Sequence, residues 1–463
     1  LSGSSHTLGF ASPVHFSGNS TLTASTVAFD QAVTADGNLV ISGATVVNGG
    51  SVNSGTYAQT YNGSVTVSGA ATDTTTFTGV GMTFGSTLDG TSRVLVNDSA
   101  ATNYSGAIGS LVAPAHFETD AAGSSTFGGG LVRTSSPNSI RIADDAVVTA
   151  DTMFDTTNNG SLTVGANITF AKTLNGAANN AQSVSINAGT NGVVLVSGAV
   201  GDTTPLSTLT LVQSNGATFS SAVTTGTSVV LTDTVDGQTI AFEGNLSTPV
   251  LTTTANGYHL ALLGSSTQVS APSTATNFVN TGNLVLGNAA SDSLSFSGGL
   301  VVAAPASISA AGTISTTQNP MTLGDADTGL TMTGDLALHA DGGVLTFNGA
   351  LVGSNHDLTL EANQVVLADV SLGGHLVSIT HGQGAAGGVS QHTGTALNIG
   401  GTSTFTAHTG TDQVAALTET NNAFTGALSF NQANSGAWAD VSVTSNTALT
   451  LGPTQSSGSV VLD

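Results

Sequence analysis

Two short groups of acidic residues are the first candidates for chemistry in this sequence. Asp144 and Asp145 are adjacent in the segment IADDAVV, and Asp325 and Asp327 lie two residues apart in GDADTG. Acid–base cleavage of a glycosidic bond needs two carboxyl groups at a defined separation on one surface. Adjacent residues of a strand point to opposite sides, so Asp144 and Asp145 make a poor catalytic pair. We expect no acid–base catalysis from either pair.

The second pair is instead a candidate for binding a calcium ion. Asp325 and Asp327 would face the same way, and Gly324 and Gly329 flank them in a turn. Calcium takes about six to eight oxygen ligands, and two carboxylates supply only part of that set. The repeated GGxGxDx calcium-binding motif is absent from the sequence. We therefore predict no cofactor, with calcium at Asp325 and Asp327 as the one metal candidate.

Histidine is the other residue type here that could bind a metal. Six of the ten histidines lie in the last third of the chain: His339, His356, His375, His381, His392 and His408. One histidine on each structural repeat would form a ladder of metal ligands. Aligning 335–340 with 357–362, at an offset of 22, places His339 opposite Glu361 and not opposite another histidine. This favours exposed turn histidines over a metal ladder.

Composition excludes several classes of function. Four Lys and Arg residues stand against 27 Asp and Glu residues, which gives a net charge of −23. Binding to nucleic acids or to anionic lipids needs many cations, so both are excluded. Lys172 is the only lysine and lies in no glycine-rich phosphate loop, and the lack of cysteine removes disulfides and thiol chemistry. No uninterrupted apolar stretch reaches the length of about 18 residues that a membrane span needs.

The elements that would position these side chains are β-strands. Apolar residues alternate with Ser, Thr or Asn along the whole chain, as in TLTLV at 208–212, DLTLE at 357–361 and LVSIT at 376–380. Alternation with a period of two is typical of half-buried strands. Asn-Gly, Asp-Gly, Gly-Gly and Ser-Gly pairs separate these segments and suit tight turns. Because no stretch has helical periodicity, the sequence predicts an all-β fold.

A pentad recurs in a loose form: an aromatic residue followed by x-Gly-x-aliphatic. Most copies start 20 to 26 residues after the previous one, and the longer gaps are near multiples of that step. Val196 begins a copy without an aromatic residue, and an alignment of 344–351 with 365–372 gives a similar offset of 21. The aromatic residues of the copies are Tyr61, Phe84, Tyr104, Phe127, Phe170, Phe219, Phe242, Phe296, Phe347 and Phe424. Periods of about 20–50 residues are typical of stacked repeats.

Stacked turns of chain would explain the pentad. Its aromatic and aliphatic residues can both face inward if the chain bends between them, and Gly allows the bend without a Cβ clash. Turns about 4.8 Å apart would pair every strand with the turns above and below it. An array of immunoglobulin-like sandwiches is the alternative, but its units have about 100 residues and a buried Trp beside a disulfide. We predict an elongated parallel β-helix, or β-solenoid, with turns of 20–26 residues.

Four phrases resemble the Gly-, Thr- and Asn-rich repeats of bacterial surface proteins. They are GGSVNSGTYAQTYNGSVTVSG at 49–69, MTFGSTLDGTSRVLVNDSA at 82–100, TDAAGSSTFGGGL at 119–131 and VSGAVGDTTPLSTLTL at 196–211. In the style of its repeats the chain is similar to filamentous haemagglutinin-type adhesins and autotransporter passenger stalks. The resemblance implies a right-handed parallel β-helix, export to the cell surface and a role in adhesion, biofilm or filament formation. It implies no catalytic residues.

These observations predict a structural protein without enzymatic activity. We expect an extracellular, cell-surface rod, filament or sheath that self-associates into a fibre or surface layer. The alternative is an adhesin that binds a glycan or a host or neighbour-cell protein through turn loops. A lyase or glycosidase on the same fold is less favoured, because it would need a groove rich in carboxylates and basic residues. We expect residues 1–463 to form one continuous array, an excerpt or mature part of a longer polypeptide.

Overall fold

The chain folds into stacked turns of parallel β-structure. The computed structural model describes residues 2–135, 139–383 and 387–463, and these contain strands and no helix. The predicted all-β fold and parallel β-solenoid are confirmed, with about 20 turns. The chain divides into two compact units, residues 1–240 and 241–463, which we describe one at a time.

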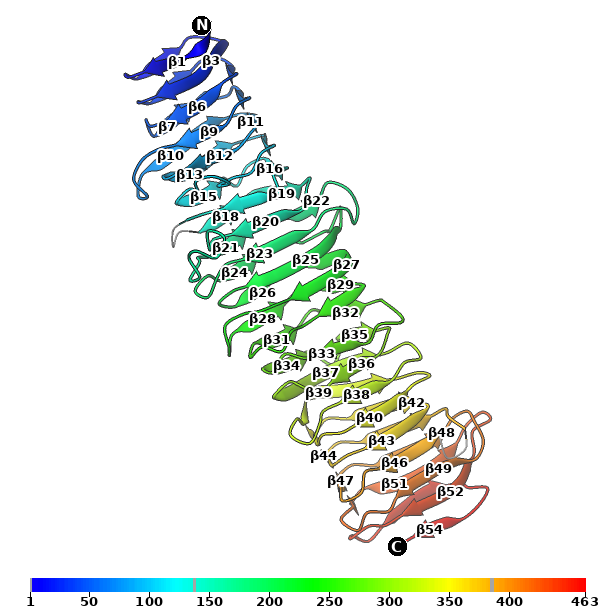
Figure 1. The fold of residues 1–463 in the computed structure, drawn as a ribbon. Helices are drawn as coiled ribbons and strands as arrows, with labels where there is room; N and C mark the ends of the chain where they lie inside the picture. Colours follow the sequence, from blue (N-terminus) through cyan, green and yellow to red (C-terminus); the bar gives the residue numbers. More distant parts are fainter. Residues whose placement is uncertain (1, 136–138, 384–386) are drawn as a thin grey trace. The chain divides into compact units, whose positions relative to one another are not determined.

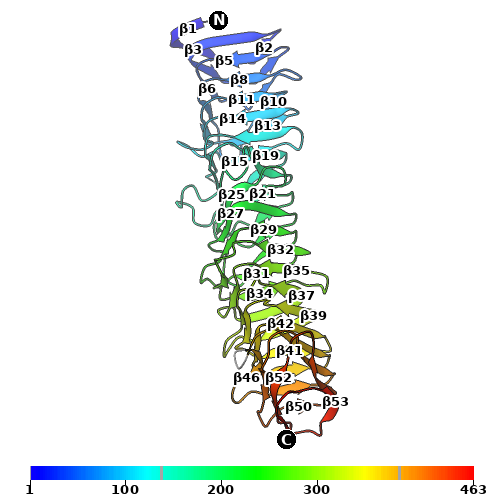
Figure 2. The same cartoon turned by 90° about the vertical axis from the view of Figure 1, so that its right-hand side faces the viewer.

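Unit 1 has three faces, and each turn takes one strand or bridge from each face (Figures 1 and 2). Face 1 contains β5 (Leu39–Ile41), β8 (Gln59–Tyr61), β11 (Met82–Phe84), β14 (Ala101–Tyr104), β16 (Ser124–Phe127), β19 (Asp145–Val148) and β22 (Leu174–Gly176). Face 2 contains β1 (Ser2–Phe10), β6 (Ala44–Val47), β9 (Val65–Val67), β12 (Leu88–Gly90), β17 (Leu131–Arg133), β20 (Thr152–Asp155), β23 (Val184–Asn187) and β25 (Leu206–Gln213). Face 3 contains β2 (Val14–Phe16), β4 (Val33–Ala35), β7 (Ser51–Asn53), β10 (Thr74–Gly79), β13 (Arg93–Asp98), β15 (His116–Thr119), β18 (Ile140–Ile142), β21 (Ile168–Phe170), β24 (Val194–Val196) and β26 (Ala217–Phe219). Two longer strands, β3 (Ser20–Phe29) and β27 (Val223–Leu231), bend from face 1 into face 2.

Unit 2 has the same architecture, with faces numbered 4 to 6. Face 4 contains β29 (Leu246–Thr248), β32 (Ser266–Val269), β35 (Ser293–Phe296), β42 (Leu358–Ala362), β45 (Leu376–Thr380), β48 (Ser403–Ala407), β51 (Ala427–Gln432) and β53 (Thr450–Thr454). Face 5 contains β30 (Val250–Thr252), β33 (Thr276–Phe278), β36 (Leu300–Val302), β38 (Met321–Leu323), β40 (Val344–Phe347), β43 (Gln364–Leu367), β46 (Gly388–Gln391), β49 (Gln413–Leu417), β52 (Trp438–Val443) and β54 (Val460–Leu462). Face 6 contains β31 (His259–Leu262), β34 (Asn283–Leu286), β41 (Leu351–Ser354), β44 (Val370–Leu372), β47 (Leu397–Ile399) and β50 (Ala423–Phe424). The strands β37 (Ser307–Ser315) and β39 (Leu330–His339) bend from face 6 into face 4, and β28 (Thr239–Phe242) includes the last residues of unit 1 and the first of unit 2.

The length of a turn varies, although the strand register is kept. In unit 1, the stretch of chain from Thr74 to its partner Arg93 is much shorter than the stretch from Ile140 to its partner Ile168. In unit 2, the turn that leads from 358 to its partner at 376 is again a short one. The extra residues of the longer turns lie in the connections between strands, so the inward positions stay stacked.

One of the two sequence alignments is off by one residue. The offset of 22 is confirmed, because Leu336 pairs with Leu358 and His339 with Glu361. The offset of 21 is wrong, because Val344 pairs with Gln364 and not with Val365, an offset of 20. The chain from His339 to Val344 is two residues longer than the chain between their partners, Glu361 and Gln364, and aligning Val344 with Val365 by residue type hid this difference. A shift of one residue exchanges the inward and outward positions of a strand.

The interior of unit 1 contains a column of aromatic rings on consecutive turns of face 1. Tyr61, Phe84, Tyr104 and Phe127 are in register and fully buried. Their ring centroids are 5.2, 5.3 and 5.2 Å apart, with interplanar angles of 11°, 6° and 7°. Each ring therefore stacks on the ring of the next turn, in addition to burying its own apolar surface.

Each pentad marks a corner between two faces. In the first copy, Tyr61 is the last residue of β8 and Val65 is the first residue of β9. The copies do not share one corner. Tyr61, Phe84, Tyr104 and Phe127 lie between faces 1 and 2, and Phe170 and Phe219 lie between faces 3 and 1. In unit 2, Phe242 and Phe424 lie between faces 6 and 4, Phe296 lies between faces 4 and 5, and Phe347 lies between faces 5 and 6.

The glycine of the pentad is required by the neighbouring turn. A Cβ atom at Gly106 would overlap the backbone of Ser86 on the preceding turn, and a Cβ atom at Gly349 in unit 2 would overlap the backbone of Thr328. Neither glycine has a positive φ. The space between two backbones, and not an unusual dihedral angle, therefore excludes a side chain at these corners.

We predict that Phe84→Ala destabilises unit 1 by about 3–5 kcal/mol, because it leaves a cavity between two stacked rings. Chemical denaturation followed by circular dichroism measures the change. Thr83→Ala, on the outward side of the same strand, is the matched control and should cost less than about 0.5 kcal/mol. Equal effects of the two substitutions would contradict the aromatic column.

We also predict that Gly106→Ala lowers the free energy of unfolding by about 1–3 kcal/mol, the usual cost of overpacking. The added methyl group must push two neighbouring turns apart. Gly18→Ala is the control, since a Cβ atom there meets no atom within 4 Å. Thermal unfolding of the two variants checks the difference, and a Gly106→Ala variant as stable as Gly18→Ala would show that the turns are not tightly apposed.

Candidate functional sites

The two adjacent carboxylates of the first acidic pair point to opposite sides, as predicted. Asp144 is 3% exposed and accepts hydrogen bonds from Thr119 Oγ1 at 2.6 Å and Ser125 Oγ at 2.8 Å. Asp145 faces outward and accepts a hydrogen bond from Thr173 Oγ1 at 2.6 Å. The two residues therefore belong to different environments, one inside unit 1 and one on its surface.

Asp144 belongs to an acidic column at the corner between faces 3 and 1. Asp98 ends β13, and Asp120 and Asp144 follow β15 and β18 on the next two turns. Asp120 Oδ1 accepts a hydrogen bond from the Asp98 N–H at 3.1 Å. Asp98 is 2% exposed, and its carboxylate accepts four hydrogen bonds, from Gly81 N, Met82 N, Ala100 N and Thr102 Oγ1. Four donors compensate the buried charge of Asp98.

Asp144 accepts hydrogen bonds from two side-chain hydroxyl groups, fewer than the four donors of Asp98. Burial raises the pKa of Asp144 above its usual range, although the bonds from Thr119 and Ser125 oppose the shift. Burial also raises the pKa of Asp120. The pKa of Tyr104 is raised by burial and then by the nearby charge of Asp144. Asp98 and Asp144 are buried, whereas Asp120 is partly exposed.

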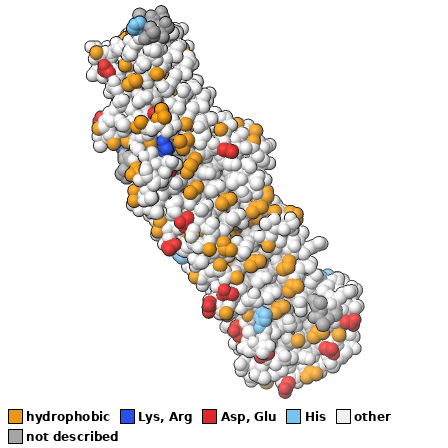
Figure 3. Space-filling view, viewed as in Figure 1, with side chains coloured by type: hydrophobic (Ala, Val, Ile, Leu, Met, Phe, Trp, Pro, Cys, Tyr) orange, Lys and Arg blue, Asp and Glu red, His pale blue; other side chains and the backbone are white. Residues whose placement is uncertain are grey.

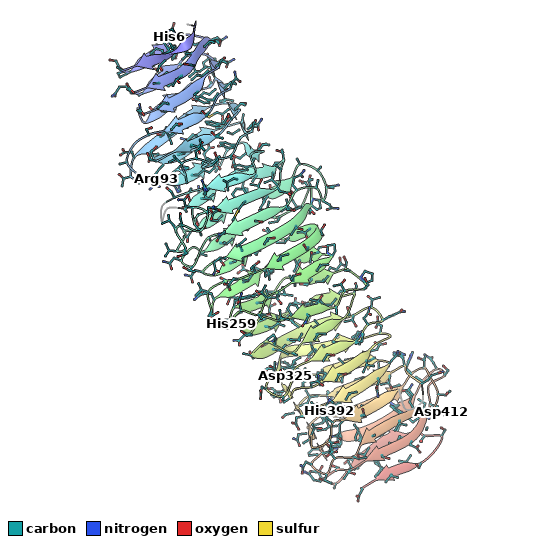
Figure 4. All side chains as sticks on the ribbon, in the orientation of Figure 1. His6, Arg93, His259, Asp325, His392 and Asp412 are labelled. Atoms are coloured by element: carbon teal, nitrogen blue, oxygen red, sulfur yellow. The ribbon has the colours of Figure 1, made fainter. Side chains whose placement is uncertain are left out.

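The calcium candidate lies in the connection between β38 and β39 (Figure 4). Asp325 Oδ1 accepts hydrogen bonds from the backbone N–H groups of Asp327 at 2.9 Å and Thr328 at 2.8 Å. These two bonds hold the pKa of Asp325 below its usual range. Within the described ranges, no group of three or more His, Asp or Glu side chains is placed to hold a metal ion. The Asp325 carboxylate thus stabilises its own turn, and calcium binding stays a prediction.

Two of the histidines contact one carboxylate of face 4, and a third histidine contacts one of them. His339 Nδ1 lies 3.5 Å from Glu361 Oε2, and His381 Nε2 lies 2.9 Å from Glu361 Oε1. The rings of His381 and His408 on the next turn have centroids 4.8 Å apart. The sequence alignment found the position of His339 opposite Glu361 but missed the approach of His381 and His408.

The remaining three histidines of this part of the chain lie apart from that group and bond to local partners. His356 lies 3.8 Å from Asp335, His375 Nδ1 accepts a hydrogen bond from Thr402 N at 3.0 Å, and His392 Nε2 lies 3.0 Å from the carbonyl oxygen of Phe347. A ladder of one histidine on every turn is therefore absent from the described part of unit 2. The two bonds of Glu361 point toward opposite neighbours, so the His339–Glu361–His381 group does not converge on one point.

A groove on the flank of unit 1 is a candidate surface site. It has a volume of about 570 Å³ and lies beside β19 and β22. Asn175 Nδ2 donates to Asp202 Oδ1 at 2.9 Å, and Asn175 Oδ1 accepts hydrogen bonds from the N–H groups of Thr203 and Thr204 at 3.3 Å. Carboxylate, amide and hydroxyl groups thus surround a floor that contains apolar side chains; the lining residues are Asp145, Val147, Thr173, Asn175, Gly176, Ala177, Asp202, Thr203 and Thr204.

Sequence reasoning did not find this groove. Asp145, Asn175 and Asp202 lie on three consecutive turns and are far apart in the chain. Only the strand register, in which Val147 pairs with Asn175, brings them together. The spacing between these three residues in the chain is close to the length of one turn. Because the turns differ in length, this spacing does not stand out in the sequence.

Comparison of the chain with protein-family models, with curated proteins and with solved structures found no match. The described residues contain no helix that is long and apolar enough to cross a membrane. The function is therefore inferred from the fold, the surface and the sites described above.

We predict that Asp144→Asn changes the pH dependence of stability. An acid whose pKa is raised on folding contributes most to stability below its unfolded pKa, and this contribution is lost as the pH rises through its folded pKa. The melting temperature of Asp144→Asn relative to that of the wild type should therefore increase as the pH rises from 3 to 8. Asp145→Asn, the neighbouring surface carboxylate, is the control and should change much less with pH. A constant difference between wild type and Asp144→Asn would contradict the buried acid.

Proposed function

We propose that this chain is a structural protein of an outer cell surface, where its stacked turns form part of a filament, sheath or stalk. The observation that carries the proposal is the stacking of interior rings on neighbouring turns. Tyr61, Phe84, Tyr104 and Phe127 stack in unit 1, and Phe405 stacks on Phe430 in unit 2 with ring centroids 5.2 Å apart. In such an array each turn is stabilised by its neighbours, which suits a protein whose role is to build length.

The outward side chains support a role in packing against other surfaces. On face 4, two rows of small uncharged residues run side by side: Ser266, Ser293 and Thr313 in one row, and Gln268, Ser295 and Ser315 in the other. Charged side chains are sparse on the faces seen in Figure 3. Contact with such a surface does not require burying many charges, which is the costly part of forming an interface.

Electron microscopy of the purified full chain tests the structural role. We expect fibres or regular layers to form as the protein concentration is raised. The same samples examined by light scattering should show mass growth without a fixed end point. Particles that stay single and compact at every concentration would contradict the proposal.

The groove beside β19 and β22 supports a second candidate function, that of an adhesin for a neutral glycan. Sugars present hydroxyl donors and apolar C–H faces. The carboxylate of Asp202 is exposed and can accept hydrogen bonds from hydroxyl groups, while Val147 and Ala177 offer apolar contact. A site of this kind binds through a few placed polar groups around an apolar floor.

A glycan array probed with the full chain tests this second function. We expect saturable binding of a neutral oligosaccharide that falls at least about tenfold for Asp202→Ala, because hydrogen bonds to a charged group contribute about 1.5–3 kcal/mol. Asp36→Ala is the control, since Asp36 is also an exposed carboxylate of unit 1 but lies outside the groove. No saturable binding, or equal loss in both variants, would rule the groove out.

A further inference from the structure

The few cations of this chain are confined to one region of unit 1. Arg93, Arg133, Arg141 and Lys172 all lie between residues 93 and 172. Unit 2 contains 13 Asp and Glu residues and neither Lys nor Arg. The Lys and Arg residues of this sequence therefore all lie in unit 1, and the charged residues of unit 2 other than histidine are acidic.

Two of the four cations are committed to structural hydrogen bonds. Arg133 donates to the carbonyl oxygens of Gly109 at 2.8 Å and Ser110 at 2.9 Å, which holds a connection in place. Lys172 Nζ donates to the carbonyl oxygen of Ala121 at 2.7 Å. These contacts leave Arg93 and Arg141 as the cations with capacity for a partner.

Arg93 and Arg141 lie on the outward side of face 3, on strands two turns apart. Arg93 begins β13 and pairs in register with His116, and Arg141 in β18 pairs with Glu118 in β15. Two turns of about 4.8 Å and an offset of two residues along the strand place the Cα atoms of the two arginines on the order of 12 Å apart. Figure 4 shows Arg93 at the flank of unit 1. We call Arg93, His116, Glu118 and Arg141 the arginine patch.

The contacts within the arginine patch leave it with excess positive charge. Glu118 Oε1 accepts a hydrogen bond from Arg141 Nη1 at 2.9 Å, and Glu118 Oε2 lies 3.1 Å from His116 Nε2. The Arg141 side chain remains 45% exposed. The guanidinium of Arg93 makes no hydrogen bond or ion pair with any residue that the structure describes. The arginine patch thus contains two guanidinium groups and one carboxylate, which leaves an excess of one positive charge.

We propose that the arginine patch is the surface on which unit 2 of a second copy of this chain docks, through its exposed carboxylates. Charge complementarity identifies the occupant. Contacts between two copies of unit 2 bring together surfaces of one sign and are repelled, whereas unit 2 against the arginine patch is attracted. A guanidinium also matches a carboxylate in shape, since both can form two parallel hydrogen bonds. The inference rests on the self-assembly proposed above and names its contact.

The proposed contact joins two different surfaces. A contact between unlike surfaces of identical chains does not close on itself unless the rotation forms a ring, so it generates an open filament. Because the contact depends on surface charges, added salt weakens it. At physiological ionic strength, exposed charges that are farther apart than about 8–10 Å are largely screened from each other. Both properties can be measured on the full chain.

Sedimentation velocity of the full chain at low and high salt tests the proposal. The variant Arg93→Gln with Arg141→Gln removes two positive charges, and we expect it to associate at least about tenfold more weakly than the wild type at low salt. The control, Ser185→Glu with Val230→Glu, brings the chain to the same net charge with outward substitutions two turns apart on face 2 and β27. The control should associate like the wild type, and circular dichroism should show both variants folded.

Three outcomes would overturn the proposal. If the glutamine variant associates as tightly as the wild type, assembly occurs through another surface, and the proposed structural function stands without the arginine patch. If the control weakens as much as the glutamine variant, net charge and not the patch governs association. If the wild type remains monomeric at low salt, both the patch and the proposed self-assembly are wrong.

Discussion

The hydrogen bonds between consecutive turns are the constraint on which the rest of this structure depends. Every described strand pairing is parallel. The strands of one turn therefore pair with those of the next in a defined register and at the fixed spacing of a sheet. That spacing places like residues on top of one another, which is why rings stack from Tyr61 to Phe127. The same spacing leaves no room for a side chain where two corners meet at Gly106.

The architecture could be predicted because its signals are local. Alternation with a period of two identifies a strand from a few residues, and the pentad identifies a bend from five. Register could not be predicted with the same success, since it depends on the lengths of connections such as the one before β40, which is longer than its counterpart before β43. The corner occupied by each pentad could not be predicted either, because the bend at Phe347 and the bend at Phe424 are alike in sequence but lie between different faces.

The same holds for the candidate sites: features of neighbouring residues could be predicted from the sequence, and sites that combine distant residues could not. The turn at Asp325 and the opposite directions of Asp144 and Asp145 were visible in the sequence, because each involves neighbouring residues. The groove beside β19 and β22 and the arginine patch each combine residues from several turns. Turns differ in length, as the short one that starts at Leu358 and the long one that starts at Ile140 illustrate, so no single spacing in the chain brings such residues into view. Only the strand pairing in the structure shows that the residues of each site lie together.

The variation in turn length has a consequence for how such a chain changes during evolution. Leu358, Leu376 and Ser403 stack in register, although the chain between the last two is much longer than the chain between the first two. Insertions and deletions at a corner therefore leave the neighbouring turns undisturbed, and duplication of a whole turn adds a new layer with its hydrogen-bond partners already in place. Surface loops can thus change one corner at a time during evolution, while the stacked strands that carry them stay the same.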